Sequence, residues 1–179
     1  SSSILNDVND TSSDNNDNDV LYGGAGNDSF YGSSGDNILD GGTGTDTIWS
    51  GTGSDTIVIR SGDGSTTLAN ADVLRDFSDG NDVIGMDGLN YGDLTIAQGT
   101  GDYSSHVVLS LTSSSEYLLV IHNTSASNIT APDFSSTSTS SQSFTGDSSN
   151  NTFIGGSGND IFSGSSGSDG LYGHGGDDS

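Results

Sequence analysis

A nine-residue period is the feature that most constrains the fold of this chain. Read from Gly23, the sequence divides into the nonapeptides GGAGNDSFY, GSSGDNILD, GGTGTDTIW and SGTGSDTIV, which end at Val58. A degenerate copy occupies 14–22, and a second block begins at Gly146 and runs to Ser179. A period of this length predicts a solenoid, in which each repeat buries its apolar residue by stacking on its neighbours.

Each place in the repeat has a physical reason. Glycines let the backbone adopt positive φ angles and turn its carbonyl groups toward a common point. The aspartate in the sixth place is a short, hard oxygen ligand that suits Ca²⁺. The triplet around the apolar eighth residue predicts a short strand whose middle side chain points inward. The predicted inward columns are Leu21, Phe30, Leu39, Ile48 and Ile57 in the first block, and Phe153, Phe162 and Leu171 in the second.

A flexible Gly/Ser/Asp linker is the alternative interpretation of such composition. A linker has no reason to place an apolar residue two positions after an aspartate at a fixed period. The spacing therefore favours a folded solenoid.

The repeat G-G-x-G-x-D-x-U-x, where U is a large apolar residue, resembles the calcium-binding nonapeptide of the RTX (repeats-in-toxin) family. The resemblance covers about half of the chain directly. It implies an all-β fold: a right-handed parallel β-roll with two nonapeptides per eighteen-residue turn, and calcium between loops on the same side of successive turns. The implied ligand pairs are Asp28 with Asp46 and Asp160 with Asp178 on one side, and Asp19 with Asn37, Asn37 with Asp55, and Asn151 with Asp169 on the other. The glycines of these implied sites are Gly23, Gly24, Gly26, Gly41, Gly42, Gly44, Gly155, Gly156, Gly158, Gly173 and Gly176.

Departures from the repeat fall on the second of these sides. Asn37 and Asn151 replace aspartate, and Ser33 and Asp147 replace the second glycine. An amide offers an oxygen but no charge, so we expect those sites to be weaker or empty.

The nonapeptides stop between 59 and 134, where alternating patterns predict strands. His106–Leu111 and Glu116–His122 flank a short turn and predict an antiparallel hairpin. The order D-x-x-x-D-F, G-x-D-x-I, hairpin and final D-F is similar to the segment that follows the nonapeptides in serralysin-type proteases and in the R-modules of alginate epimerases. That resemblance implies a β-sandwich-like cap, which a solenoid needs because its last turn exposes an unpaired edge. Two roles stay open for its aspartates, an additional calcium site or turn formation with solvated charge: Asp72, Asp76, Asp79 and Asp82.

We therefore divide the chain into five parts. They are a lead-in (1–13), a first roll (14–58), the cap (59–134), a Ser/Thr-rich linker (135–143) and a second, truncated roll (144–179). Because the chain starts without Met and stops within a repeat, we expect it to be a piece of a longer protein.

The charge balance excludes several partners. Asp and Glu number 25 and Lys and Arg number 2, which gives a formal net charge of −23. Nucleic acid and anionic membranes both require basic contacts, so we expect neither as a partner. No cysteine is present, and the apolar runs are too short to span a bilayer. High charge with few apolar residues predicts disorder unless cations neutralise it, so we expect several Ca²⁺ ions as cofactors, and folding that depends on their binding.

Catalytic motifs are not found in the sequence, and we expect no enzymatic activity. His106 and His122 lie on facing predicted strands, which favours a cross-strand contact over a catalytic site, and His174 stands in a second-glycine place. The family resemblance implies type I secretion and an extracellular or cell-surface location.

Two functions are consistent with these features. The first is a structural or adhesive module of a large bacterial protein of the adhesin or surface-layer type, with neighbouring copies or modules as partners. The alternative is an accessory module of a secreted protease or polysaccharide-modifying enzyme, which would contact extracellular polysaccharide. For that role Tyr22, Tyr31 and Trp49 are candidates for an outward-facing aromatic ladder.

Overall fold

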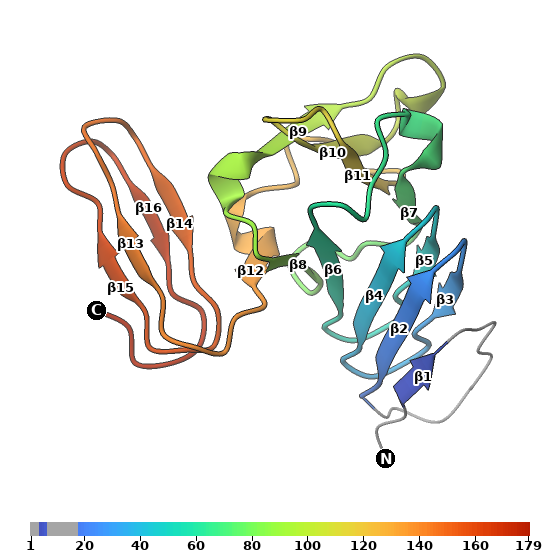
Figure 1. Ribbon diagram of the computed structural model, residues 1–179, viewed down its shortest axis with the longest axis horizontal. Helices are drawn as coiled ribbons and strands as arrows, with labels where there is room; N and C mark the ends of the chain where they lie inside the picture. The colour runs from blue at the N-terminus through green and yellow to red at the C-terminus, as the bar shows by residue number, and fades with distance from the viewer. Residues whose placement is uncertain (1–3, 7–17) are drawn as a thin grey trace.

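The protein consists of two stacks of short strands on either side of an irregular cap (Figure 1). The structure, a computed structural model, describes residues 4–6 and 18–179. One sheet has the order β1-β2-β4-β6-β8-β12 and a second has the order β3-β5-β7-β11-β10-β9. The strands of the first sheet are β1 (Ile4–Asn6), β2 (Val20–Ala25), β4 (Ile38–Thr43), β6 (Thr56–Arg60), β8 (Val83–Asp87) and β12 (Phe134–Ser136). Those of the second are β3 (Ser29–Tyr31), β5 (Thr47–Trp49), β7 (Asp72–Leu74), β9 (Leu94–Gln98), β10 (Val107–Leu111) and β11 (Tyr117–Ile121).

The repeat period sets the strand register of the first roll. Leu21 pairs with Leu39 and Leu39 with Ile57 across β2, β4 and β6, while Phe30 pairs with Ile48 across β3 and β5. All five side chains are buried, which confirms that they point inward. The single column expected for them is wrong, because residues nine positions apart fall in different sheets and form two columns. The all-β, parallel-roll fold is confirmed.

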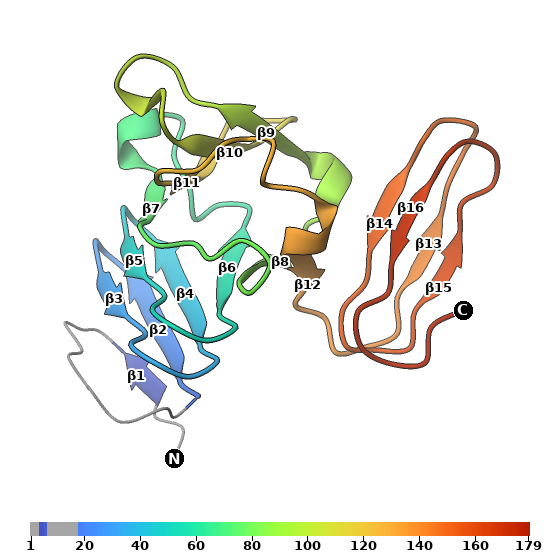
Figure 2. The ribbon, with the colours of Figure 1, turned by 180° about the vertical axis from the view of Figure 1, so that it is seen from behind.

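The cap continues both sheets without a break. Ile57 pairs with Ile84 of β8, and Ile48 with Leu74 of β7, so the columns of the roll extend into the cap through longer connections. The predicted hairpin is present, because β10 and β11 pair antiparallel. Short 3-10 helices link these strands: η1 (Leu68–Asn70), η2 (Tyr91–Asp93), η3 (Gly101–Tyr103) and η4 (Ala131–Asp133). Figure 2 shows the cap above the end of the first roll from the other side.

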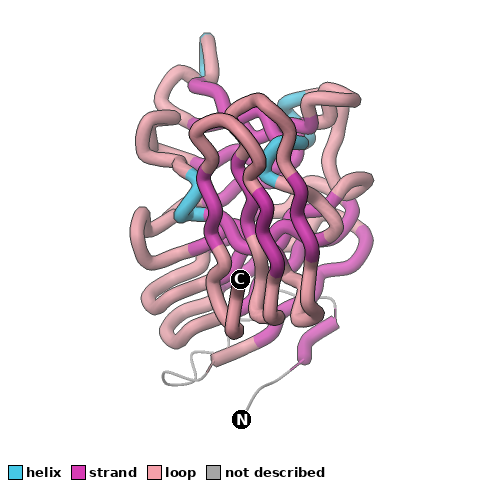
Figure 3. The backbone as a smooth tube through the Cα atoms, turned by 90° about the vertical axis from the view of Figure 1, so that its left-hand side faces the viewer, coloured by secondary structure: helices cyan, strands magenta, loops and turns pink. Residues whose placement is uncertain are grey.

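The second roll is thinner than the first. Its strands are β13 (Ser143–Thr145), β14 (Thr152–Ile154), β15 (Ile161–Ser163) and β16 (Gly170–Tyr172), paired in parallel as β13–β15 and β14–β16. Its predicted inward column is only partly enclosed: Phe153 and Phe162 are half-buried, and Leu171 keeps 46% of its surface exposed. With two strands in each sheet, the interior of this roll stays open at its end (Figure 3).

The second roll contacts the cap through β14 and β16. Ile154 is buried in the main hydrophobic cluster, and Tyr172 packs against that cluster. The stretch 135–143, expected as a linker, includes the end of β12 and the start of β13. No helix in the described part of the chain is long and apolar enough to cross a membrane.

Candidate calcium sites

The sixth-place residues of successive turns are joined by a repeated hydrogen bond. The backbone N–H of each residue donates to the side-chain oxygen of the residue eighteen positions later. Asp28 N–H donates to Asp46 Oδ1 at 2.8 Å, and Asp160 N–H donates to Asp178 Oδ1 at 2.8 Å. On the opposite side the corresponding bonds are Asp19 to Asn37 (3.0 Å), Asn37 to Asp55 (2.9 Å) and Asn151 to Asp169 (2.9 Å). The structure therefore brings together every pair that the repeat spacing predicts.

The second carboxylate oxygen of the first-roll aspartates has no hydrogen-bond partner. This holds for Oδ2 of Asp28, Asp46 and Asp55, although each of these atoms is buried. Asp46 and Asp55 have no exposed surface. Burial raises the pKa of Asp46 to about 6 and also raises that of Asp55. A buried, unpaired carboxylate oxygen is costly unless a cation meets it.

Backbone carbonyl oxygens of one turn lie close to the glycines of the next turn. Gly42 and Gly44 have positive φ angles, 81° and 151°, and a methyl group on either would overlap the carbonyl oxygen of Gly24 or Gly26 in the preceding turn. A side chain on Gly41 would collide with Asp46 Oδ2. The same relation holds between Gly23 and Asp28, Gly155 and Asp160, and Gly173 and Asp178. Glycine at these places therefore allows loop oxygens and carboxylates to approach each other closely.

Two aspartates of the cap continue the columns of the roll. Asp46 N–H donates to Asp72 Oδ1 at 2.8 Å, and Asp55 N–H donates to Asp82 Oδ1 at 3.2 Å. Burial raises the pKa of Asp72 to about 8 and also raises that of Asp82. Asp76 accepts hydrogen bonds from the N–H groups of Ser50 and Gly51. Asp72 thus lies at one loop column, while Asp76 and Asp82, which both accept the Ser50 hydroxyl, lie at the other.

The donor set suits calcium better than a transition metal. Within residues 4–6 and 18–179, no group of three or more His, Cys, Asp or Glu side chains is arranged to hold a metal ion by side chains alone. Each gap between turns instead offers two sixth-place side chains and several carbonyl oxygens. Ca²⁺ accepts six to eight oxygen ligands, backbone carbonyls included, whereas zinc prefers nitrogen and sulfur.

Asn37 uses its side chain differently from the aspartates. Its Oδ1 accepts the N–H of Asp19, and its Nδ2 donates to Gly32 O (3.2 Å), Gly35 O (3.0 Å) and Asp55 Oδ1 (2.9 Å). The amide orientation follows from this network, because the N–H of Asp19 requires an acceptor. The NH₂ group therefore lies where the aspartates of neighbouring repeats have their unpaired oxygen.

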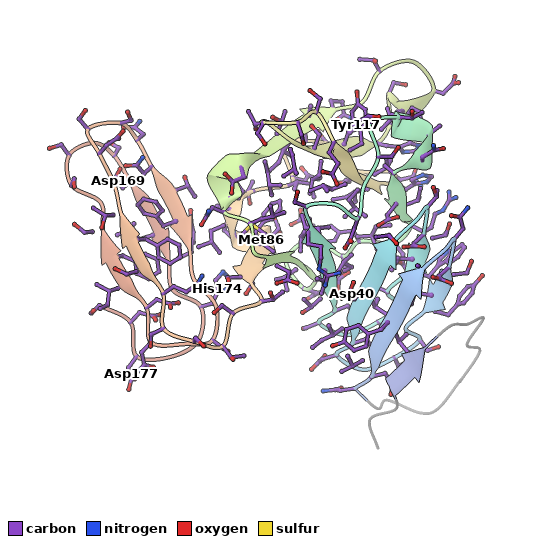
Figure 4. All side chains as sticks on the ribbon, viewed as in Figure 1. Asp40, Met86, Tyr117, Asp169, His174 and Asp177 are labelled. Carbon is purple, nitrogen blue, oxygen red and sulfur yellow. The ribbon has the colours of Figure 1, made fainter. Side chains whose placement is uncertain are left out.

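Asn151 begins its column and shows the opposite orientation. Its Oδ1 lies against Gly146 and accepts the N–H of Asp147 at 3.1 Å. Its oxygen thus takes the place that Oδ2 of an aspartate takes elsewhere. In the second roll Asp160 is buried and Asp169 half-buried, while Asp178 is exposed. Figure 4 shows Asp169 and Asp177 at opposite ends of this roll, where its two loop columns lie.

The two arginines are engaged within the fold. Arg60 forms ion pairs with Asp40, Asp63 and Asp87. Arg75 lies over the ring of Trp49, 5.9 Å from its centroid, and its guanidinium is 3.0 Å from Nδ1 of His122. His122 stacks on His106 with ring centroids 4.0 Å apart, so the expected cross-strand contact is confirmed.

The three candidate aromatic residues do not form one ladder. Tyr31 and Trp49 stack face to face with centroids 4.6 Å apart, on β3 and β5. Tyr22 lies on β2, in the other sheet. The expectation of a three-residue ladder is wrong, because residues nine positions apart fall on opposite sides of a roll with two nonapeptides per turn.

A parallel roll with paired aspartates and loop carbonyls between its turns defines a calcium-binding β-roll. The RTX calcium-binding nonapeptide repeat family (4 copies) matches residues 6–39, 31–65 and 145–179, slightly more than half of the chain. The protein therefore belongs to the RTX calcium-binding repeat family.

Among solved structures, the solution structure of the AlgE6R3 subunit from the Azotobacter vinelandii mannuronan C5-epimerase is similar to this chain. The sequence identity is 22% and the TM-score 0.44, over 72% of this chain and 83% of that chain. No curated protein matches the chain in sequence.

Proposed function

We propose that this chain is a structural module that folds when Ca²⁺ binds between the turns of its rolls. In this proposal the ions bind in the gaps bounded by Asp28, Asp46 and Asp72 on one side of the first roll. Asp55 and Asp82 bound a further gap on the other side, and Asp160 with Asp178, and Asn151 with Asp169, bound those of the second roll. We assign no ion to the gap between the Asn37 and Asp55 loops, because the NH₂ group of Asn37 already donates hydrogen bonds to the oxygens there.

The unpaired Oδ2 atoms of Asp28, Asp46 and Asp55 support this assignment most directly. Arg60 is paired with three other aspartates, and Arg75 contacts Trp49 and His122, so neither neutralises these carboxylates. An ion present at 100 times its Kd stabilises the folded state by about 2.7 kcal/mol. Several such ions would provide most of the stability of a chain with a net charge of −23.

The working environment in this proposal is the outside of the cell. Calcium sites of extracellular modules have Kd values of about 10⁻⁴ to 10⁻³ M, so they bind calcium far more weakly than cytosolic calcium buffers do. A roll of this kind would stay unfolded where calcium is scarce and fold after secretion. The protein would then act as a stiff structural or adhesive part of a larger secreted or surface protein, without catalysis of its own.

The alternative, an accessory module that binds polysaccharide for a secreted enzyme, has less support. Sugar rings stack on exposed aromatic faces, but Tyr31 and Trp49 each use one ring face in their mutual stack, and Arg75 lies over Trp49. Polysaccharide binding in calcium that disappears in Trp49→Ala, while the variant stays folded, would favour the alternative.

Calcium titration of the full chain tests the proposal. Circular dichroism follows folding, and isothermal titration calorimetry counts the ions. We expect β-structure to form as calcium is added and to disappear with a chelator. Asp46→Asn should lose at least one ion, because it converts this place to the kind found at Asn37.

Asp102→Asn is the matched control, since it makes the same charge change at an exposed residue of η3. A spectrum unaffected by millimolar calcium, or equal ion counts for the two variants, would contradict the proposal.

A further inference from the structure

The second roll begins one repeat earlier than its glycines indicate. Residues 137–145 read TSTSSQSFT and contain neither glycine nor aspartate, yet each place aligns with the nonapeptide eighteen positions later. Gln142 stands in the place of Asp160, and Phe144 in the place of Phe162. The family match starts only at residue 145.

Backbone hydrogen bonds identify this stretch as a loop of the roll. Gln142 N–H donates to Asp160 Oδ1 at 2.7 Å, and Ile161 N–H donates to Gln142 O at 2.9 Å. The same two bonds join the Asp28 and Asp46 loops, at 2.8 and 2.9 Å. Phe144 stacks on Phe162, with centroids 5.1 Å apart.

Carbonyl groups of this loop approach the next turn at the same places of the repeat as in the first roll, although Gly156 and Gly158 lack the positive φ angles of Gly42 and Gly44. A methyl group on Gly156 would overlap the carbonyl oxygen of Ser138, and one on Gly158 that of Ser140. These contacts repeat those between Gly42 and Gly44 and the turn before them. The gap between the two loops therefore forms although Ser138 and Ser140 stand in glycine places of the earlier loop.

Gln142 Oε1 is buried and has no hydrogen-bond partner. Among the described residues, the other buried side-chain oxygens without a partner are Oδ2 of Asp28, Asp46 and Asp55, which hold the same place in the repeat. Asp160, on the other side of the gap, is only 1% exposed. Its Oδ1 accepts the N–H of Gln142 and its Oδ2 that of Gly156 at 3.1 Å. A buried carboxylate in the loop next to an unpaired buried amide oxygen favours a cation between the two loops.

We propose that the loops 137–142 and 155–160 bind a further Ca²⁺ ion, with Gln142 Oε1, the Asp160 carboxylate and loop carbonyl oxygens as its ligands. The proposal rests on the calcium-dependent folding proposed above. With one carboxylate in place of two, this gap binds its ion more weakly than the gap between Asp28 and Asp46.

The proposed site would also join the second roll to the cap. Thr137 N–H donates to the carbonyl oxygen of Met86 in β8, and Ser136 N–H donates to that of Gly155. The loop that contains Gln142 is thus anchored to the cap on one side and to the second roll on the other. An ion bound here fixes the second roll to the cap, and its loss at low calcium releases the second roll first.

Two substitutions of the full chain test the site with opposite expected effects. Gln142→Ala removes the oxygen and should lose the weakest ion in isothermal titration calorimetry. Gln142→Glu keeps the shape and adds a charge beside the ion, so the weakest calcium-binding step should shift to lower calcium by about tenfold or more. Ser141→Glu is the matched control, because it adds the same charge at the exposed neighbouring residue.

Amide NMR shifts of residues 137–145 during the titration give a local readout that is independent of the ion count. If both Gln142 variants match the control in ion count and in the weakest binding step, the inference is overturned while calcium-dependent folding stands. If wild type binds no calcium at all, the proposed function fails instead.

Discussion

Replacing Asn37 by aspartate should convert a gap closed by hydrogen bonds into one that requires calcium. The substitution removes the Nδ2 group, whose two protons are shared among Gly32 O, Gly35 O and Asp55 Oδ1. One neutral bond at about 1 kcal/mol and one to a carboxylate at about 2 kcal/mol sum to about 3 kcal/mol. The new carboxylate also faces Asp55 with like charge. The free energy of unfolding should therefore fall by at least about 3 kcal/mol when calcium does not occupy the gap.

Calcium should restore much of this loss in Asn37→Asp. An extra ion at 100 times its Kd contributes about 2.7 kcal/mol, which offsets most of the hydrogen-bond loss. Each tenfold rise in calcium near saturation should stabilise the variant by about 1.4 kcal/mol more than wild type, since it binds one ion more. Urea unfolding at two calcium concentrations about tenfold apart measures this difference.

Asn27→Asp is the matched control for this prediction. Asn27 is exposed in the fifth place of its repeat, where Asp36 occurs naturally one repeat later. Its Oδ1 accepts the N–H of Thr45, and an aspartate can keep that bond. The reasoning is refuted if Asn37→Asp and Asn27→Asp have the same stability and the same calcium dependence.

Three further outcomes are expected at fixed, saturating calcium. Arg60→Gln should cost about 2 kcal/mol in urea unfolding, because it leaves the buried Asp40 without its cation. Arg75→Gln removes no ion pair with the residues that the structure describes and should cost less, and equal costs would contradict this account. Burial, then the neighbouring imidazole and guanidinium, lower the pKa of His122, so the unfolded chain binds more protons and stability should fall as pH drops below the unfolded value of about 6.5. His122→Phe should flatten the unfolding free energy between pH 7 and pH 5, and an unchanged pH slope would exclude His122 as its source. Trp49→Ala should lower stability by about 1 kcal/mol or more through loss of its aromatic stack, and a variant as stable as wild type would refute a structural role for the pair.

Much of the fold was predictable because the repeat is local and regular. The apolar eighth residue recurs every nine positions, so Leu21, Leu39 and Ile57 had to fall in one column once two nonapeptides form a turn. The resemblance to the RTX family implied that Asp28 and Asp46 lie in neighbouring loops, and their loops are joined by a 2.8 Å hydrogen bond. The hairpin of β10 and β11 followed from alternation of apolar residues.

Two features of the sites could not be predicted from residue types alone. Residues 137–145 lack both marker residues of the repeat, and only Phe144, one period before Phe153, indicated that the column begins there. The composition of this stretch is that of a linker. Its loop nevertheless forms, because its backbone groups make the hydrogen bonds, and any residue type has those groups. Asn37 and Asn151 have the same place in the repeat but opposite amide orientations.

The sequence by itself determined the period, the strand register and the identity of the carboxylates, because these depend on spacing along one chain. The tertiary structure decided which oxygens lack a partner. Asn37 turns its NH₂ into the gap because a preceding turn presents the N–H of Asp19 to its oxygen, whereas Asn151 has no such turn before it. Leu171 stays exposed because its sheet ends after two strands. Burial and hydrogen bonding depend on what the neighbouring turn contributes, and that is a property of the assembled roll.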